Sequence, residues 1–142
     1  MSRDDVTLLQ AALAAEHAVV YGYGVLGAQL DLRTRRTAQL AFDAARARRD
    51  QLAARLRERG AEPVVALPAY AVQVDSVTSA LALAVRLEAA MAVRWRDLVA
   101  GTDDSALRRL AVTALVEAAV RATSWRERAG YEPVTVALPG VS

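Results

Sequence analysis

The chain has 142 residues, of which 54% are hydrophobic and 24% are charged, and its formal net charge is only +2. This composition is typical of one ordinary globular domain, residues 1–142, with enough apolar side chains to bury a core. Because the chain has no cysteine, disulfides, thiolate metal ligands and cysteine nucleophiles are excluded.

The first predicted helix runs from about residue 4 to 30. Apolar residues recur along it at steps of three and four, which marks one face of an α-helix, and Glu16 lies on that face. Next to it stands His17, the only histidine in the chain. Two polar groups in the middle of this apolar stretch make a membrane span costly, and the start, MSRDDVTLL, lacks the basic charge of a secretory signal. We therefore expect a cytoplasmic protein that does not enter a membrane.

Three further helices are predicted, at about residues 33–59, 76–100 and 103–129. The second ends at Gly60 and holds nine arginines against three acids, a local net charge of +6. The third follows Asp75 or Ser76, which are good N-caps, and carries Glu88 on its apolar face. The fourth ends before Gly130. No segment alternates with the two-residue period of a strand, so we expect an all-α fold.

The connections indicate how these helices are arranged. Helices one and two are joined by about three residues, and so are helices three and four, which predicts two antiparallel hairpins. About 16 residues, GAEPVVALPAYAVQVD, separate the hairpins. Extended, they reach about 50 Å, whereas a helix of 25 residues is about 37 Å long. The sequence therefore predicts a four-helix bundle with one long crossover.

An internal repeat supports two related hairpins. QLAFDAARA precedes RERGAEPV in the first half, and RLAVTALVE precedes RERAGYEPV in the second, about 70 residues later. Glu16 lies seven residues before Tyr23, as Glu88 lies seven before Trp95. Two hairpins related by a pseudo-twofold axis would give this pattern.

The topology and the pair of inward-facing glutamates resemble the ferritin-like superfamily. More narrowly, LAAEHAVVYGYG, ARRDQL, LAVRLE, the later WR pairs and the terminal LPG resemble a small ferritin-like family of unknown function, mostly from actinobacteria. The resemblance covers nearly the whole chain. It implies a ferritin-like four-helix bundle and implies no particular activity.

Di-iron members of the superfamily supply one Glu from each of two helices and Glu-x-x-His from each of the other two. Glu16 and Glu88 match the single-Glu positions, but neither Glu-x-x-His motif is present. A divergent metal-binding protein or oxidase that holds iron or manganese with carboxylates alone stays open. Its candidate ligands are Glu16, Asp50, Glu88 and Glu117.

We prefer a buried polar network without metal. Glu16 precedes Arg49 by 33 residues, and Glu88 precedes Arg121 by the same interval, so each hairpin can bring one Glu and one Arg to equal depth. A guanidinium pairs with carboxylate and repels a metal cation. His17 is expected to be a structural member of this network. Whether Arg48 or Arg49 faces the core is left open by the pattern.

The expected function is therefore that of a non-enzymatic interaction or structural module with no cofactor, and no small-molecule ligand is indicated. A second alternative is anion or nucleic-acid binding through the arginine-rich second helix, although interspersed acids disfavour it. Apolar side chains also lie away from the core faces, at Leu8, Val19 and Leu26 in helix one and at Val112, Val116 and Val120 in helix four. Exposed apolar patches of this kind predict a homodimer. The alternative is that the crossover or the tail covers them.

Overall fold

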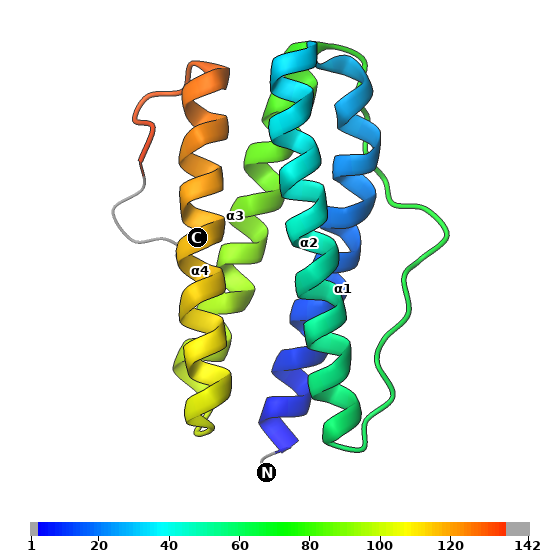
Figure 1. The fold of residues 1–142 in the computed structure, drawn as a ribbon, viewed down its shortest axis with the longest axis vertical. Coiled ribbons are helices and arrows are strands. Elements are labelled where there is room, and N and C mark those ends of the chain that lie inside the picture. The colour runs from blue at the N-terminus through cyan, green and yellow to red at the C-terminus, as the bar shows by residue number, and fades with distance from the viewer. Residues whose placement is uncertain (1–2, 136–142) are drawn as a thin grey trace.

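The structure is a computed structural model that describes residues 3–135, and Figure 1 shows four long helices lying along one axis. They are α1 (Arg3–Leu26), α2 (Leu32–Glu58), α3 (Val77–Gly101) and α4 (Ser105–Ala129), and a 3₁₀ turn, η1 (Gly27–Gln29), follows α1. Within residues 3–135 there is no strand. The prediction of an all-α bundle of two hairpins joined by one long crossover is confirmed.

The helix ends lie where the sequence provides capping groups. Asp31 begins α2 by accepting a hydrogen bond from the Thr34 amide, and Ser76 forms a reciprocal capping box with Ser79 at the start of α3. After α2 and α4 the chain turns at Gly60 and Gly130, with φ of 71° and 75°. This left-handed backbone favours glycine. The first helix is α-helical only to Leu26, where η1 tightens its last turn.

The core is formed mainly by the apolar stripes of the four helices. The first helix, α1, packs against both α2 and α3, while α4 packs chiefly on α3. A side chain at Gly22 would bring its Cβ to 2.6 Å from Leu87 Cδ1, so glycine permits the close approach of α1 and α3. Among the described helices, none has the length and apolar character needed to cross a membrane.

The crossover between α2 and α3 is held against α1 by polar side chains. Gln10 Nε2 donates to the Glu62 carbonyl at 2.7 Å, and Gln10 Oε1 accepts from the Val64 amide at 2.8 Å. His17 Nε2 lies 2.9 Å from the Val64 carbonyl, and this geometry requires a proton on that nitrogen. Figure 1 shows the crossover as the long green trace beside α1. His17 therefore positions the crossover on the surface of the bundle.

The two apolar faces expected outside the core differ in the structure. Val19 and Leu26 are buried, and Leu8 is half-buried against the core. The expectation that this face of α1 is exposed is therefore wrong, because neighbouring elements cover it. On α4, by contrast, Val112, Val116 and Val120 are 43%, 56% and 64% exposed.

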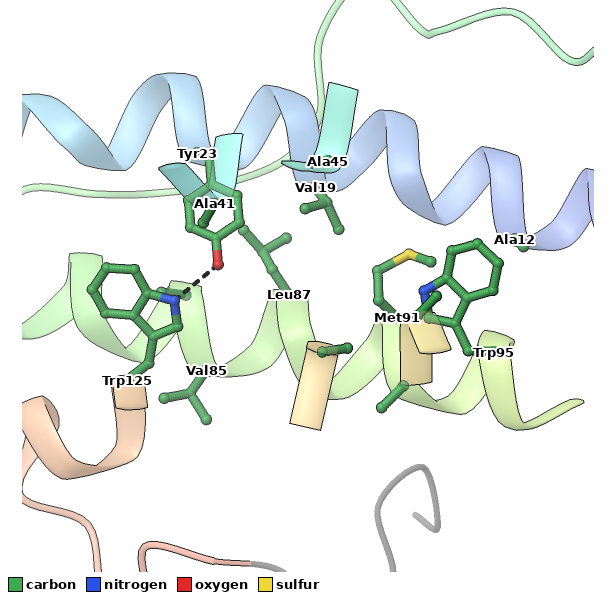
Figure 2. Close-up of a cluster of buried hydrophobic side chains, with 14 of the residues drawn as sticks. Ala12, Val19, Tyr23, Ala41, Ala45, Val85, Leu87, Met91, Trp95 and Trp125 are labelled. Atoms are coloured by element: carbon green, nitrogen blue, oxygen red, sulfur yellow. Dashed lines mark hydrogen bonds between the residues drawn. The ribbon is translucent and has the colours of Figure 1, made fainter. Parts of the chain in front are cut away.

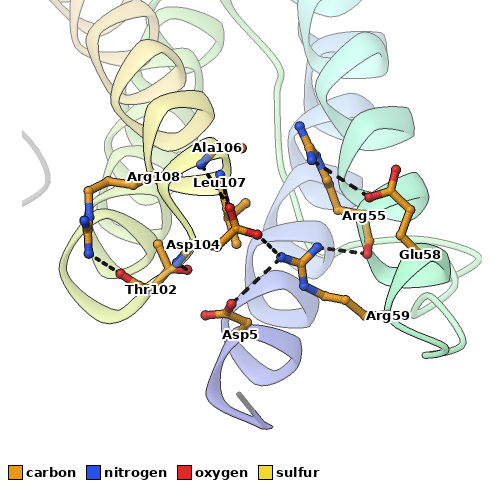
Figure 3. A network of polar contacts seen from close by, with 9 residues as sticks. All are labelled: Asp5, Arg55, Glu58, Arg59, Thr102, Asp104, Ala106, Leu107 and Arg108. Carbon is orange, nitrogen blue, oxygen red and sulfur yellow. Dashed lines mark hydrogen bonds and ion pairs between the residues drawn. The ribbon is translucent and has the colours of Figure 1, made fainter. Parts of the chain in front are cut away.

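A polar network joins three helices at the end of the bundle where α4 begins (Figure 3). Arg59, which follows α2, has a side chain only 4% exposed. Its Nη2 donates to Asp104 Oδ2 at 2.8 Å and lies 3.9 Å from Asp5 Oδ2 on α1. Asp104 Oδ1 also accepts from the amides of Ala106 and Leu107 as the N-cap of α4. One carboxylate thus caps a helix and binds a buried guanidinium.

Replacing Asp104 with Ala is expected to lower the free energy of unfolding by about 1–2 kcal/mol, because the first turn of α4 loses its cap and Arg59 loses a partner. Asp103→Ala is the matched control, since Asp103 is exposed and caps nothing, and it should change stability by under about 0.5 kcal/mol. Urea unfolding of the two variants measures the difference. An equal loss of unfolding free energy in the two variants would contradict the assignment of Asp104 as the cap.

Candidate functional site

The two inward-facing glutamates are deeply buried at the centre of the bundle. Glu16 on α1 is 3% exposed and Glu88 on α3 is 2% exposed. Both stand on the apolar stripes that pack α1 against α3, which is why the fold carries them inward. A carboxylate removed from water must be neutralised, hydrogen-bonded or paired. The surroundings of the two groups meet this requirement in different ways.

Glu88 is held by hydrogen bonds from two other helices. Arg121 Nε on α4 donates to Glu88 Oε2 at 3.0 Å, and the Tyr23 hydroxyl on α1 donates to the same oxygen in a short hydrogen bond. Burial raises the pKa of Glu88, and Arg121 and Tyr23 act against that rise. The carboxylate therefore has a charge partner and a neutral donor inside the core.

Tyr23 links Glu88 to a second aromatic side chain. Trp125 Nε1 on α4 donates to the Tyr23 oxygen at 2.9 Å, and Figure 2 shows the hydroxyl pointing at the indole nitrogen. Burial, reinforced by the charge of Glu88, raises the pKa of Tyr23 well above its ordinary value. The phenol thus keeps its proton and serves as a donor. Trp125, Tyr23 and Glu88 form one directed chain of hydrogen bonds.

Glu16 has no hydrogen-bond partner among the described residues. Burial, and then the charge of Glu88, raises the pKa of Glu16 to about 8, and the positive charges of Arg121 and Arg48 oppose this rise. Glu16 is therefore mostly protonated at neutral pH. The centre of the bundle then holds one carboxylate with its arginine and one neutral carboxylic acid.

The structure selects Arg48 over Arg49 as the arginine of α2 that faces the interior. Arg48 Nη2 donates to Glu117 Oε2 on α4 at 2.6 Å, and its side chain is 14% exposed. Arg49 Nε instead donates to its neighbour Asp50 at 3.0 Å, near the surface. The 33-residue interval suggested Arg49 for the depth of Glu16, with Arg48 left open, and the arginine of α2 whose charge acts on Glu16 is Arg48.

The five residues of the expected polar network are thus only partly brought together. Glu88 and Arg121 are in direct contact, and the charges of both shift the pKa of Glu16. His17 binds the crossover backbone instead. The sequence pattern did not reveal that Tyr23 is a donor to Glu88 or that Trp125 is a donor to Tyr23. Both residues lie on the core-facing stripes of their helices, and each carries a polar O–H or N–H that needs a partner when buried. That combination is the sequence feature that could have indicated their role.

The carboxylates that could have held a metal are dispersed. Asp50 is exposed beside Arg49, and Glu117 is half-exposed and bound to Arg48. Within residues 3–135 no group of three or more His, Cys, Asp or Glu side chains is placed to hold a metal ion. Of the carboxylates suggested as ligands, only Glu16 and Glu88 share the interior.

Two clefts open on the surface of the bundle. One, of about 540 Å³, lies between the end of α1 and the start of α2 and includes Arg35, Gln39 and Phe42. The other, of about 790 Å³, lies between the crossover and α3 and includes Tyr70, Ser79 and Arg86. Neither is lined by Glu16 or Glu88. The first cleft is, however, also lined by Tyr23, whose hydroxyl donates to Glu88.

Comparison with known proteins assigns the chain to a family. Over 95% of its length it matches the crystal structure of a conserved hypothetical protein, rv2844, from Mycobacterium tuberculosis, with a TM-score of 0.85, 38% identity and 96% of that chain covered. No curated protein matches it. Residues 8–142 match the family model described as Domain of unknown function (DUF4439). The chain therefore belongs to the DUF4439 family.

Proposed function

We propose that the protein is a non-enzymatic ferritin-like bundle that has lost the di-iron site and acts as a helical interaction module. The observation that carries this proposal is the binding of Glu88 by Arg121 and Tyr23. A guanidinium and a phenol both donate to Glu88 Oε2, an oxygen that a metal would need as a ligand. Both are donors, and neither is a metal ligand in this protonation state.

The charge balance of the interior supports the same proposal. Arg121 neutralises Glu88, and Glu16 carries a proton at neutral pH. A divalent metal would bring two more positive charges next to Arg121 and Arg48, and it would have to displace the proton of Glu16. The arginines therefore disfavour a cation at this position on electrostatic grounds.

Metal analysis of protein purified with and without added iron or manganese tests this proposal. We expect far less than one ion per chain in either preparation, and no rise in melting temperature on adding metal, since a ligand that binds the folded state would raise it. One ion per chain that is lost in Glu16→Gln and Glu88→Gln, but kept in the exposed control Glu62→Gln, would overturn it.

Anion binding through α2 is disfavoured by the partners of its arginines. Arg48 binds Glu117, Arg55 lies 3.9 Å from Glu58, and Arg35 donates to the Gly27 and Leu30 carbonyls. A phosphate would have to break these contacts. Part of the positive charge of this helix is thus bound within the bundle, whereas the exposed Arg36 and Arg57 have no ion pair among the described residues.

We also propose that the module self-associates as a homodimer. The exposed valines of α4 support this, because apolar side chains gathered on one helix face mark contact surfaces more often than isolated ones do. A module that carries no chemistry can act only through what it binds, and a second copy is a partner that is always present.

A further inference from the structure

The face of α4 that points away from the core has a repeating pattern of its own. The buried face of this helix consists of Leu107, Ala111, Ala114, Ala118 and Trp125. On the opposite side, steps of four and three residues connect six positions: Arg109, Thr113, Val116, Val120, Thr123 and Glu127. This spacing is the a/d pattern of a coiled-coil seam. We call these six residues the α4 seam.

The middle of the α4 seam is apolar beyond its two valines. The Thr113 hydroxyl donates to the Arg109 carbonyl at 3.1 Å, and the Thr123 hydroxyl donates to the Ala119 carbonyl at 3.0 Å. Both hydroxyls are therefore satisfied by their own helix, and each threonine can offer its methyl group to a partner. The seam thus presents four small branched side chains in succession, with Val116 and Val120 at its centre.

The ends of the α4 seam carry opposite charges. Arg109 stands at one end and Glu127 at the other, and neither side chain has an ion pair or hydrogen bond within the part of the chain that the structure describes. The seam from Arg109 to Glu127 is about 27 Å long at 1.5 Å per residue. A partner helix in the antiparallel direction would need the reverse order of charges.

A second copy of α4 meets this requirement. When two α4 helices run antiparallel about a twofold axis at Ala118, Val116 faces Val120 of the partner, and Thr113 faces Thr123 of the partner. The same register places Arg109 opposite Glu127 of the partner, twice. In antiparallel coiled coils a positions face d positions, and all three pairings obey this rule. The seam is therefore complementary to itself, as an interface with twofold symmetry requires.

We infer that two copies of the chain associate through antiparallel α4 seams, with Val116 packed on Val120 of the partner and Arg109 paired with Glu127 of the partner. This inference rests on the self-association proposed above and adds its surface, direction and register. The apolar face of α1 does not compete, because Val19 and Leu26 are buried within the protomer. One helix from each copy buries an area at the small end of specific interfaces, so the dimer is weak, with a dissociation constant in the micromolar range.

Charge reversal tests the register without disturbing the core, since both residues are exposed. Analytical ultracentrifugation over a concentration series should show a monomer–dimer equilibrium for the natural sequence. Arg109→Glu and Glu127→Arg should each raise the dissociation constant of the dimer by about tenfold or more, because each creates two like-charge contacts. The double variant restores opposite charges, so its dissociation constant should lie within about threefold of that of the natural sequence. The control is Leu40→Asp, because Leu40 is an exposed leucine on α2. This variant should leave the dissociation constant unchanged.

Cysteine cross-linking gives an independent measurement, because the chain has no cysteine of its own. A mixture of Val116→Cys and Val120→Cys should form the mixed disulfide faster than either variant forms a disulfide with itself, since the Cβ atoms must approach to about 4 Å. If a dimer forms but neither charge reversal changes its dissociation constant nor the mixed disulfide forms faster, the α4 seam is overturned and self-association is not. A protein that stays monomeric at about millimolar concentration would overturn both.

Discussion

Replacing Glu16 with Gln is expected to stabilise the protein at pH 8 and to leave its stability nearly unchanged at pH 4. The folded-state pKa of about 8 lies above the ordinary carboxyl value of 4.5, so the folded chain binds this proton more tightly than the unfolded chain. Stability from the protonated group is full below pH 4.5 and is lost as the pH rises toward 8. Glutamine has nearly the same shape and cannot lose a proton.

The expected gain for Glu16→Gln at pH 8 is about 2–4 kcal/mol, which corresponds to a rise in melting temperature of about 10 °C. At pH 4 the two proteins should agree within about 0.5 kcal/mol. Thermal unfolding at both pH values measures this, with the exposed Glu62→Gln as the control for charge removal. A Gln variant that is less stable at pH 8 would mean that the Glu16 carboxylate is bound by something that a neutral amide cannot replace.

Replacing Arg121 with Met is expected to lower the free energy of unfolding by about 2–4 kcal/mol at pH 8, because it leaves the buried Glu88 without its charge partner. The loss should be smaller at pH 5. Burial raises the pKa of Glu88, and without Arg121 the carboxyl can take up a proton and remain buried as a neutral acid. Chemical denaturation at the two pH values measures both effects.

Two further variants separate this buried pair from an ordinary surface pair. Arg94→Met removes an arginine that lies 3.7 Å from Asp97, with both side chains well exposed, and should cost under about 0.5 kcal/mol. The double variant Arg121→Met with Glu88→Gln should recover part of the loss, since the uncompensated charge is gone. Equal losses at Arg94 and Arg121, or a double variant worse than the sum of its parts, would contradict a structural pairing of Glu88 with Arg121.

The sequence was sufficient for the architecture. Apolar residues at three- and four-residue steps, capping residues such as Asp31 and Ser76, and the glycines after α2 and α4 are local signals. They depend on the chain within a few residues, so they can be read before the fold is known. The crossover length then limited how two hairpins could be joined. The burial of Glu16 and Glu88 followed because their neighbours on the same stripes are apolar.

The partners of these glutamates could be identified only from the tertiary structure. Arg48 and Arg49 flank the same stripe and differ by 100° around the helix, so only the position of α4 relative to α2 brings Arg48 to Glu117. The pairing of Tyr23 with Glu88 crosses from one hairpin to the other. Contacts of that kind depend on the separation and rotation of whole helices.

The sequence by itself therefore determined an all-α bundle with two buried acids and without the histidine motifs of a di-iron site. Only the tertiary structure decided that Glu88 takes both donors while Glu16 is left to hold a proton. It also decided that the second face of α1 is covered and that of α4 is open. The physical reason is the same in each case. Side-chain pattern fixes the direction in which a residue points on its helix, and helix packing fixes what it meets there.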